Sequence, residues 1–147
     1  MFRKITAADE AVYTELLREF YHSPAVLHPI PEEYYHRAFE EAVKDSPYAE
    51  AYLFEQDGQI AGYGTLAKTF STEAGGPVIW LEEVYIRQEF RGSGLGSRFF
   101  RFIEEMYEGT AARLRLEVEP DNEAAIRLYT RLGYEALPYR QMIKPLI

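Results

Sequence analysis

Two segments in the first third of the chain carry apolar residues at helical spacing. In the first, apolar residues recur every three or four positions: Val12, Leu16, Leu17 and Phe20. This spacing predicts a helix that ends near Tyr21, and the Thr-Ala-Ala-Asp sequence at 6–9 is similar to a capping box at its start. A second helix is expected over 32–44, with Pro31 at the N1 position where it begins and Pro47 beyond its end.

The rest of the chain alternates strand-like and helix-like patterns. We expect strands over 2–5, 51–55, 60–70, 78–86 and 114–119, and two short final strands near 134–137 and 139–144. Asp57-Gly58 predicts a hairpin turn between the second and third strands. Two further helices are expected, over 97–107 and from 123 to Gly133. This order fits a mixed α/β sheet of about six or seven strands with four helices, in a single domain over 1–147.

Composition and charge narrow the classes of function. The 147 residues contain no cysteine, which excludes disulfides, thiolate metal sites and a cysteine nucleophile. No apolar run approaches the ~18 residues of a membrane span, and the N-terminus lacks the apolar core of a signal peptide, so we expect a cytoplasmic protein without a membrane partner. The net charge of −8 argues against a nucleic-acid partner. It suits a cationic small molecule, and it equally suits simple solubility.

A glycine-rich stretch, Arg-Gly-Ser-Gly-Leu-Gly-Ser at 91–97, lies between the strand predicted over 78–86 and the following helix. Such a turn exposes backbone N–H groups at a helix N-terminus, where phosphate binds favourably. It is no Walker A loop, because Gly96 is followed by Ser97 and Arg98 in place of Lys and Ser or Thr. It also lacks the third glycine of a dinucleotide fingerprint.

A second motif follows downstream. Asn122, Ala125, Tyr129, Gly133 and Tyr134 form the pattern Asn-x-x-Ala-x-x-x-Tyr-x-x-x-Gly-aromatic. In this order and spacing, the two motifs resemble the coenzyme A loop and the second conserved segment of GNAT-superfamily N-acetyltransferases. The strand before the loop resembles that of the diamine and polyamine acetyltransferases.

This resemblance implies a fold in which two central strands splay apart and the pantetheine arm inserts between them. It implies acetyl-CoA as co-substrate and no metal. The expected coenzyme A contacts are the backbone of Val84 and Ile86, the loop N–H groups, Arg91 beside the pyrophosphate, and residues of the second motif. The complete set is Val84, Tyr85, Ile86, Arg91, Gly92, Ser93, Gly94, Leu95, Gly96, Ser97, Asn122 and Ala125. Asn122 is alternatively a simple helix cap.

Two acidic residues, Glu82 and Glu83, interrupt the apolar strand. A carboxylate buried there is costly unless it is paired, which favours a functional role. In a regular strand the two point to opposite faces. The resemblance makes Glu82 the first choice for the catalytic base, with Glu83 as a substrate-binding residue or the alternative base. The structural alternative is an ion pair with Arg87 or Arg115.

Tyr129 is the third catalytic candidate. By resemblance it donates a proton or a hydrogen bond to the departing thiolate, as a phenol of pKa ~10 is able to do. The alternative is an ordinary core tyrosine on an amphipathic helix.

The acceptor side is expected among the first two helices, the loop between them and the loop at 71–77. Candidates there are Tyr21, His28, Tyr34 and Glu73. The function expected from the resemblance is direct acetyl transfer, in a ternary complex, to a primary amine of a small molecule. The alternatives are a protein or peptide N-acetyltransferase and a non-catalytic acetyl-CoA sensor; a homodimer is left open.

Overall fold

The computed structural model describes all 147 residues, which form two compact units, Met1–Glu117 and Val118–Ile147. We describe each unit by itself. None of the helices combines the length and the apolar character that a membrane crossing requires.

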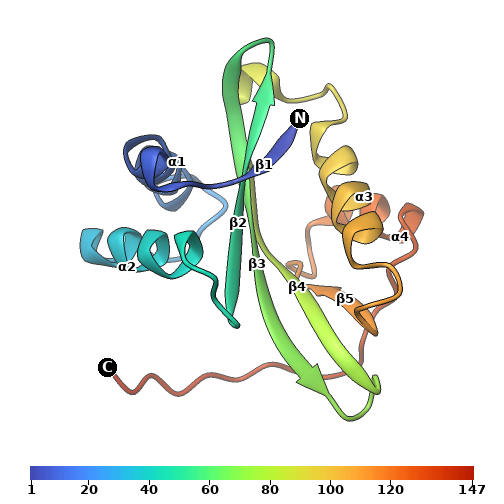
Figure 1. The fold of residues 1–147 in the computed structure, drawn as a ribbon. Coiled ribbons are helices and arrows are strands. Elements are labelled where there is room, and N and C mark those ends of the chain that lie inside the picture. Colours follow the sequence, from blue (N-terminus) through green and yellow to red (C-terminus); the bar gives the residue numbers. More distant parts are fainter. The chain divides into compact units, whose positions relative to one another are not determined.

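The first unit is built on a five-stranded sheet in the order β1-β2-β3-β4-β5 (Figure 1). The strands are β1 (Phe2–Lys4), β2 (Ala49–Gln56), β3 (Gln59–Ser71), β4 (Gly76–Ile86) and β5 (Arg113–Leu116). The first four strands pair antiparallel, and β5 is parallel to β4. The predicted Asp57-Gly58 turn joins β2 to β3, and both residues have the positive φ angles that such a tight hairpin requires.

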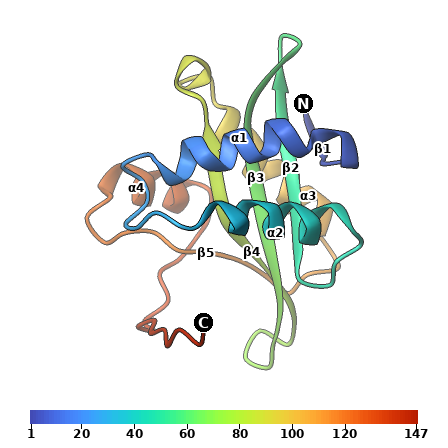
Figure 2. The same ribbon diagram turned by 90° about the vertical axis from the view of Figure 1, so that its left-hand side faces the viewer.

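Helices cover both faces of this sheet. The turn η1 (Ala7–Asp9) leads into α1 (Glu10–Tyr21), and α2 (Glu32–Val43) packs beside α1 on one face (Figure 2). The turn η2 (Gln88–Phe90) and α3 (Leu95–Tyr107) follow β4, and α3 lies on the other face. The core between α1, α2 and the sheet contains Tyr13, Leu16, Leu17, Tyr35, Phe39, Leu53 and Tyr63. Phe54 and Phe99, whose rings are 4.6 Å apart, are buried on the α3 side.

The second unit contains α4 (Glu123–Arg131), and its ends follow from local chemistry. The side chain of Asn122 accepts a hydrogen bond from the Ala125 N–H at 3.2 Å and so caps the helix start. At the other end, the N–H of Gly133 bonds to the carbonyl of Thr130, and the N–H of Tyr134 to that of Tyr129. This is a Schellman motif, with the predicted glycine at its left-handed position.

The predicted helices and the first five strands are present, with shifted ends. Pro31 precedes α2 as its N-cap, α3 begins at Leu95, two residues earlier than expected, and β5 ends at Leu116. The prediction of six or seven strands was too high, because residues 134–137 and 139–144 form no strand. Pro138 interrupts this stretch, and Met142 and Ile143 stay about 90% exposed, so no buried face drives pairing there.

Candidate active site

The glycine-rich loop forms the entrance to α3. Gly92 and Gly94 have φ angles of 81° and 79°, which side chains rarely tolerate, and Gly94 is the N-cap of α3. The backbone N–H groups of residues 92–97 donate no hydrogen bond within the chain. A Cβ at Gly92 or Gly94 would meet nothing, so the glycines serve backbone conformation and access. The loop therefore presents a run of available donors at the positive end of a helix, which suits a phosphate group.

Arg91 stands at the start of this loop and is exposed. Its Nε donates a 2.7 Å hydrogen bond to the backbone carbonyl of Ile86, the last residue of β4, and its guanidinium lies 5.8 Å from the ring centroid of Tyr85. The side chain is thus held between the end of the strand and the glycine loop, where it is able to reach an anion on the loop.

The edge of β4 beside the loop lacks a strand partner. Pairing with β5 covers only Val78–Leu81, whereas β4 continues to Ile86. In the β3–β4 ladder, the Arg87 N–H donates to the Ala61 carbonyl. Antiparallel pairing alternates, so the N–H and C=O groups of Val84 and Ile86 point away from β3. Within this unit, β4 continues beyond its pairing with β5, as the fold prediction required. Both backbone groups of Val84 and the N–H of Ile86 are open to another extended chain, whereas the Ile86 carbonyl accepts the hydrogen bond from Arg91.

Glu82 occupies a bulge in β4. Glu83 is opposite Thr65 and Leu81 is opposite Leu66, so Glu82 has no partner on β3. The strand is therefore not regular here, and strict alternation does not separate the two acids as the sequence suggested. Burial is the largest cause of the raised pKa of Tyr21, and the charges of Glu83 and Glu82 raise it further. Both carboxylates thus affect the same hydroxyl electrostatically.

Glu83 is held by two tyrosines from different elements. The hydroxyl of Tyr21, at the end of α1, donates to its Oε2, and the hydroxyl of Tyr63 on β3 donates to its Oε1 at 3.1 Å. Burial raises the pKa of Glu83; the two hydrogen bonds lower it in part, Glu82 raises it, and the net shift is upward. Partial desolvation, with a smaller effect of Glu117, also raises the pKa of Glu82, whose side chain remains accessible to solvent.

Neither acid forms the ion pair that the structural alternative required. Arg87 bonds instead to Glu19 at 2.9 Å and approaches Glu15 at 3.3 Å, tying α1 to the end of β4. Arg115 lies over the Trp80 ring at 4.2 Å. Two carboxylates with raised pKa values and no cationic partner thus lie in the strand that leads to the phosphate-binding loop, an arrangement that suits proton transfer or cation binding.

Of the four predicted acceptor residues, only Tyr21 touches this carboxylate pair. His28 is exposed in the segment between α1 and α2. Tyr34 packs under the guanidinium of Arg37 at 5.0 Å, and Glu73 forms a 3.3 Å ion pair with Arg113. Glu73 lies in the β3–β4 turn, on the order of 20 Å along the strand from Glu83.

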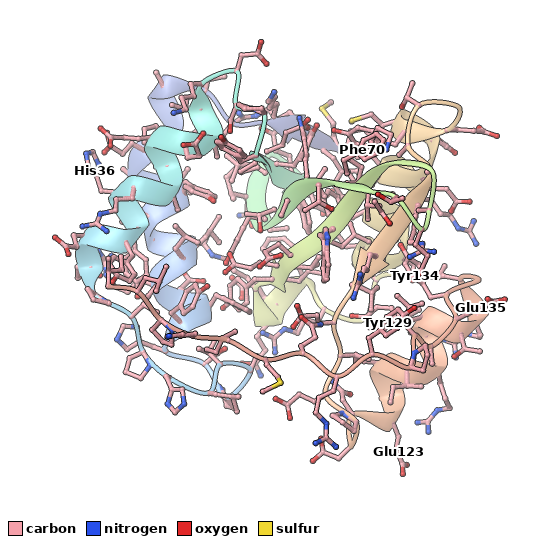
Figure 3. All side chains as sticks on the ribbon, turned by 90° about the horizontal axis from the view of Figure 1, so that it is seen from below. His36, Phe70, Glu123, Tyr129, Tyr134 and Glu135 are labelled. Atoms are coloured by element: carbon pink, nitrogen blue, oxygen red, sulfur yellow. The ribbon has the colours of Figure 1, made fainter.

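The residues of the second motif lie together in the second unit. Tyr129 is half-buried, and its ring centroid is 6.1 Å from that of Tyr134. Both residues are labelled in Figure 3. Burial raises the pKa of Tyr129, so its hydroxyl stays protonated and able to donate. No group of three or more His, Cys, Asp or Glu side chains is arranged to hold a metal ion.

Sequence reasoning missed Tyr63, which is fully buried and holds Glu83. The available signal was its position between two glycines in a strand. A Cβ at Gly62 would come within 2.1 Å of the Tyr85 carbonyl oxygen, and one at Gly64 within 2.4 Å of the Phe99 ring. Glycines inside a strand mark such close approaches, and here they flank a residue of the site.

The chain is similar in sequence to known acetyltransferases. The chain is 35% identical to the thialysine N-epsilon-acetyltransferase of Bos taurus over 79 residues, 53% of this chain and 46% of that protein. It is 31% identical to the putative ribosomal protein bS18-alanine N-acetyltransferase of Bacillus subtilis strain 168 over 105 residues, 71% of this chain and 62% of that protein. These matches span about half to under two thirds of the relatives' lengths.

The fold is also found among solved structures. A possible acetyltransferase from Clostridium difficile 630 superposes with a TM-score of 0.86 at 15% identity, covering 100% of this chain and 97% of that one. The Acetyltransferase (GNAT) family matches residues 10–134, from α1 through the aromatic residue after α4. Because this match covers well over half of the chain, the protein belongs to the GNAT family of acetyltransferases.

Proposed function

We propose that this protein is an acetyl-CoA-dependent N-acetyltransferase that moves an acetyl group directly to a primary amine of a small molecule. The observation that carries the proposal is one continuous path in the first unit. It runs from the free N–H groups of residues 92–97, along the unpaired edge of β4, to the carboxylates of Glu82 and Glu83. A phosphate site, an extended-chain site and a base are what this chemistry needs.

The cofactor contacts follow from that path. The N–H groups from Gly92 to Ser97 bind the pyrophosphate, with Arg91 beside them. The open N–H and C=O of Val84 and the N–H of Ile86 pair with the pantetheine amides as another strand would, and Tyr85 lies between them. Asn122 and Ala125 in the second unit are further proposed contacts, although the Asn122 side-chain oxygen and the Ala125 N–H already bond to each other as the cap of α4. The proposed domain includes both units, because the family match crosses their boundary at Glu117.

The chemistry requires a neutral amine and a stabilised thiolate. Glu82 accepts the proton of the acceptor ammonium, directly or through water, and its raised pKa makes it a better base than an ordinary glutamate. The amine nitrogen forms a bond to the acetyl carbon, and the carbon–sulfur bond breaks. Tyr129 donates a proton to the departing sulfur and regains one from solvent, which also takes the second proton that the acetylated nitrogen loses. Glu83 binds the positive charge of the acceptor or acts as the alternative base.

A cationic small molecule is the favoured acceptor class. The chain carries a net charge of −8, which attracts cations over long range. The Bos taurus relative is named for thialysine, a small molecule. A peptide N-terminus is the second candidate, favoured by the identity to the ribosomal-protein alanine acetyltransferase. The presence of two carboxylates without a cationic partner argues against a third candidate, an acetyl-CoA sensor, since a sensor needs no base.

Coenzyme A release from acetyl-CoA tests the proposal, with polyamines, aminoglycosides, amino acids and short peptides as acceptors. We expect release with one cationic class, and a drop in turnover of about 10²–10⁴-fold for Glu82→Gln and at least about tenfold for Tyr129→Phe. Glu89→Gln, an exposed glutamate in η2, is the matched control and should leave turnover unchanged.

Each failure has its own meaning. If acetyl-CoA stabilises the protein against heat but no acceptor releases coenzyme A, the sensor replaces the enzyme as the better reading. Full turnover by Tyr129→Phe would remove Tyr129 from the mechanism. Full turnover by Glu82→Gln with loss in Glu83→Gln would transfer the role of base to Glu83.

A further inference from the structure

The surroundings of Glu83 are unusual because they supply hydrogen bonds but no positive charge. Tyr21 donates to one carboxylate oxygen and Tyr63 to the other. The hydroxyls come from α1 and β3, 62 and 20 residues away along the chain. A carboxylate held at both oxygens has a defined orientation.

The groups that face Glu83 are known from each element packed against it. Tyr13 and Tyr21 face it from α1, Tyr63 from β3, and Glu82 is its neighbour on β4. No lysine, arginine or histidine is paired with it. The only factors that favour its ionised form are therefore the two tyrosine hydroxyls.

These hydroxyls remain donors at any pH at which the protein works. Burial, followed by the charge of Glu83, raises the pKa of both Tyr21 and Tyr63. A tyrosine that cannot ionise next to a carboxylate serves only as a neutral hydrogen-bond donor. The rings also pack among Phe20, Tyr35 and Tyr85, so the hydroxyls have little freedom to turn away.

We propose that Tyr21 and Tyr63 are positioning residues that keep the Glu83 carboxylate ionised and aimed, so that it binds a positively charged group of the acceptor. The acceptor half of this proposal rests on the proposed function; the hydrogen-bonded pair does not. Aromatic faces around a lone carboxylate provide both a charge and a cation–π surface for an ammonium group. Tyr21 also connects Glu83 to the segment after α1, so the site depends on where that helix ends.

The test removes one hydroxyl at a time, in Tyr21→Phe and Tyr63→Phe, which keep the rings. The first readout is the pKa of the Glu83 carboxyl group. It is measured by NMR titration of the carboxyl carbon, whose signal is assigned by comparison with Glu83→Gln. Each variant should raise this pKa by about one unit, as expected for loss of a hydrogen bond to a charged group. The second readout is the KM for a cationic acceptor as a function of pH. Its acidic limb should move upward by the same amount, with kcat at high pH changed less than threefold.

Tyr52→Phe is the matched control. It deletes a tyrosine hydroxyl that donates at 2.5 Å to a different buried glutamate, Glu50, which contacts α3. It should leave both the Glu83 pKa and the KM profile unchanged. An unmoved Glu83 pKa in both Tyr21→Phe and Tyr63→Phe would overturn the proposal, as would an equal shift in Tyr52→Phe. A shifted pKa in a protein that acetylates nothing would refute the proposed function and leave the tyrosine pair supported.

Discussion

Glu50 and Glu83 are two buried or half-buried glutamates that share one feature and differ in another. Each accepts hydrogen bonds from two tyrosine hydroxyls: Tyr52 and Tyr107 for Glu50, Tyr21 and Tyr63 for Glu83. Glu50 also pairs with Lys68, whose Nζ lies 2.5 Å from its Oε1, whereas Glu83 has no cation. The two sites therefore differ by one positive charge beside a carboxylate that tyrosines already hold.

The two carboxylates consequently titrate in opposite directions. Burial raises the pKa of Glu50, but the hydrogen bonds from Lys68, Tyr107 and Tyr52 outweigh it and leave the pKa below the ordinary value. Burial dominates at Glu83, and its pKa stays above the ordinary value. A carboxylate with its cation joins elements together; one without its cation keeps an unsatisfied charge that a ligand is able to use.

Their positions agree with this division. Glu50 connects β2 to Lys68 on β3 and to Tyr107 at the end of α3, on the face away from α1. Glu83 lies on the α1 side, in the strand that leads to the glycine loop. We therefore expect changes at Glu50 to affect stability, and changes at Glu83 to affect acceptor binding.

The largest effect should come from removing the cation. Lys68→Met keeps the apolar stem but leaves Glu50 charged and unpaired, so the free energy of unfolding at pH 7 should fall by about 3 kcal/mol. Urea denaturation measures this value. Coenzyme A release per folded molecule should not change. A loss below about 1 kcal/mol would mean that the tyrosines alone stabilise the Glu50 charge.

A matched pair of amide substitutions should separate the two sites next. Glu50→Gln loses the ion pair and should lower the free energy of unfolding by about 2 kcal/mol. Glu83→Gln keeps an acceptor for a tyrosine hydroxyl and removes a charge that has no counterion, so stability should stay within about 0.5 kcal/mol or increase. The acceptor KM should rise only in Glu83→Gln. Equal destabilisation by both would show that Glu83 is structural.

The smallest effect concerns the pH dependence of stability. Because the folded pKa of Glu83 lies above its ordinary value of 4.5, the protonated form contributes stability that is present at low pH and is lost as pH rises through the folded pKa. Glu50, with a lowered pKa, contributes in the opposite sense: its stability is lost as pH falls below 4.5.

Denaturation curves collected from pH 4 to 7 would resolve these contributions. The stability of the wild type relative to Glu83→Gln should decrease as pH rises above about 4.5, by less than about 1 kcal/mol in total. Relative to Glu50→Gln it should increase over the lower part of the range. The same sign for both differences would contradict the opposite pKa shifts of Glu50 and Glu83.

Several parts of this protein follow from local sequence alone. The period of apolar residues predicts α1 and α2 because a helix buries one face whatever it packs against. The glycine loop and the Asn122 and Gly133 caps depend on nearby backbone conformation and hydrogen bonds, so both motifs could be recognised without tertiary information. The two final strands were mispredicted because a strand exists only where a partner and a buried face are available.

The fine structure of the site was decided by the tertiary fold. Nothing near Glu82 in sequence signals a bulge, because the bulge is a mismatch in register between β4 and β3. Glu82 and Glu83 are the same residue type in neighbouring positions, so the sequence does not distinguish them. Only Glu83 receives two tyrosine hydrogen bonds, from α1 and β3, which are distant from it in the chain. Likewise, the pairing of β2 with β3 brings Lys68 to Glu50, whereas no lysine is brought to Glu83. Local patterns determine which elements form, whereas the charge state of a buried carboxylate depends on which distant side chains the packed elements bring within hydrogen-bond distance.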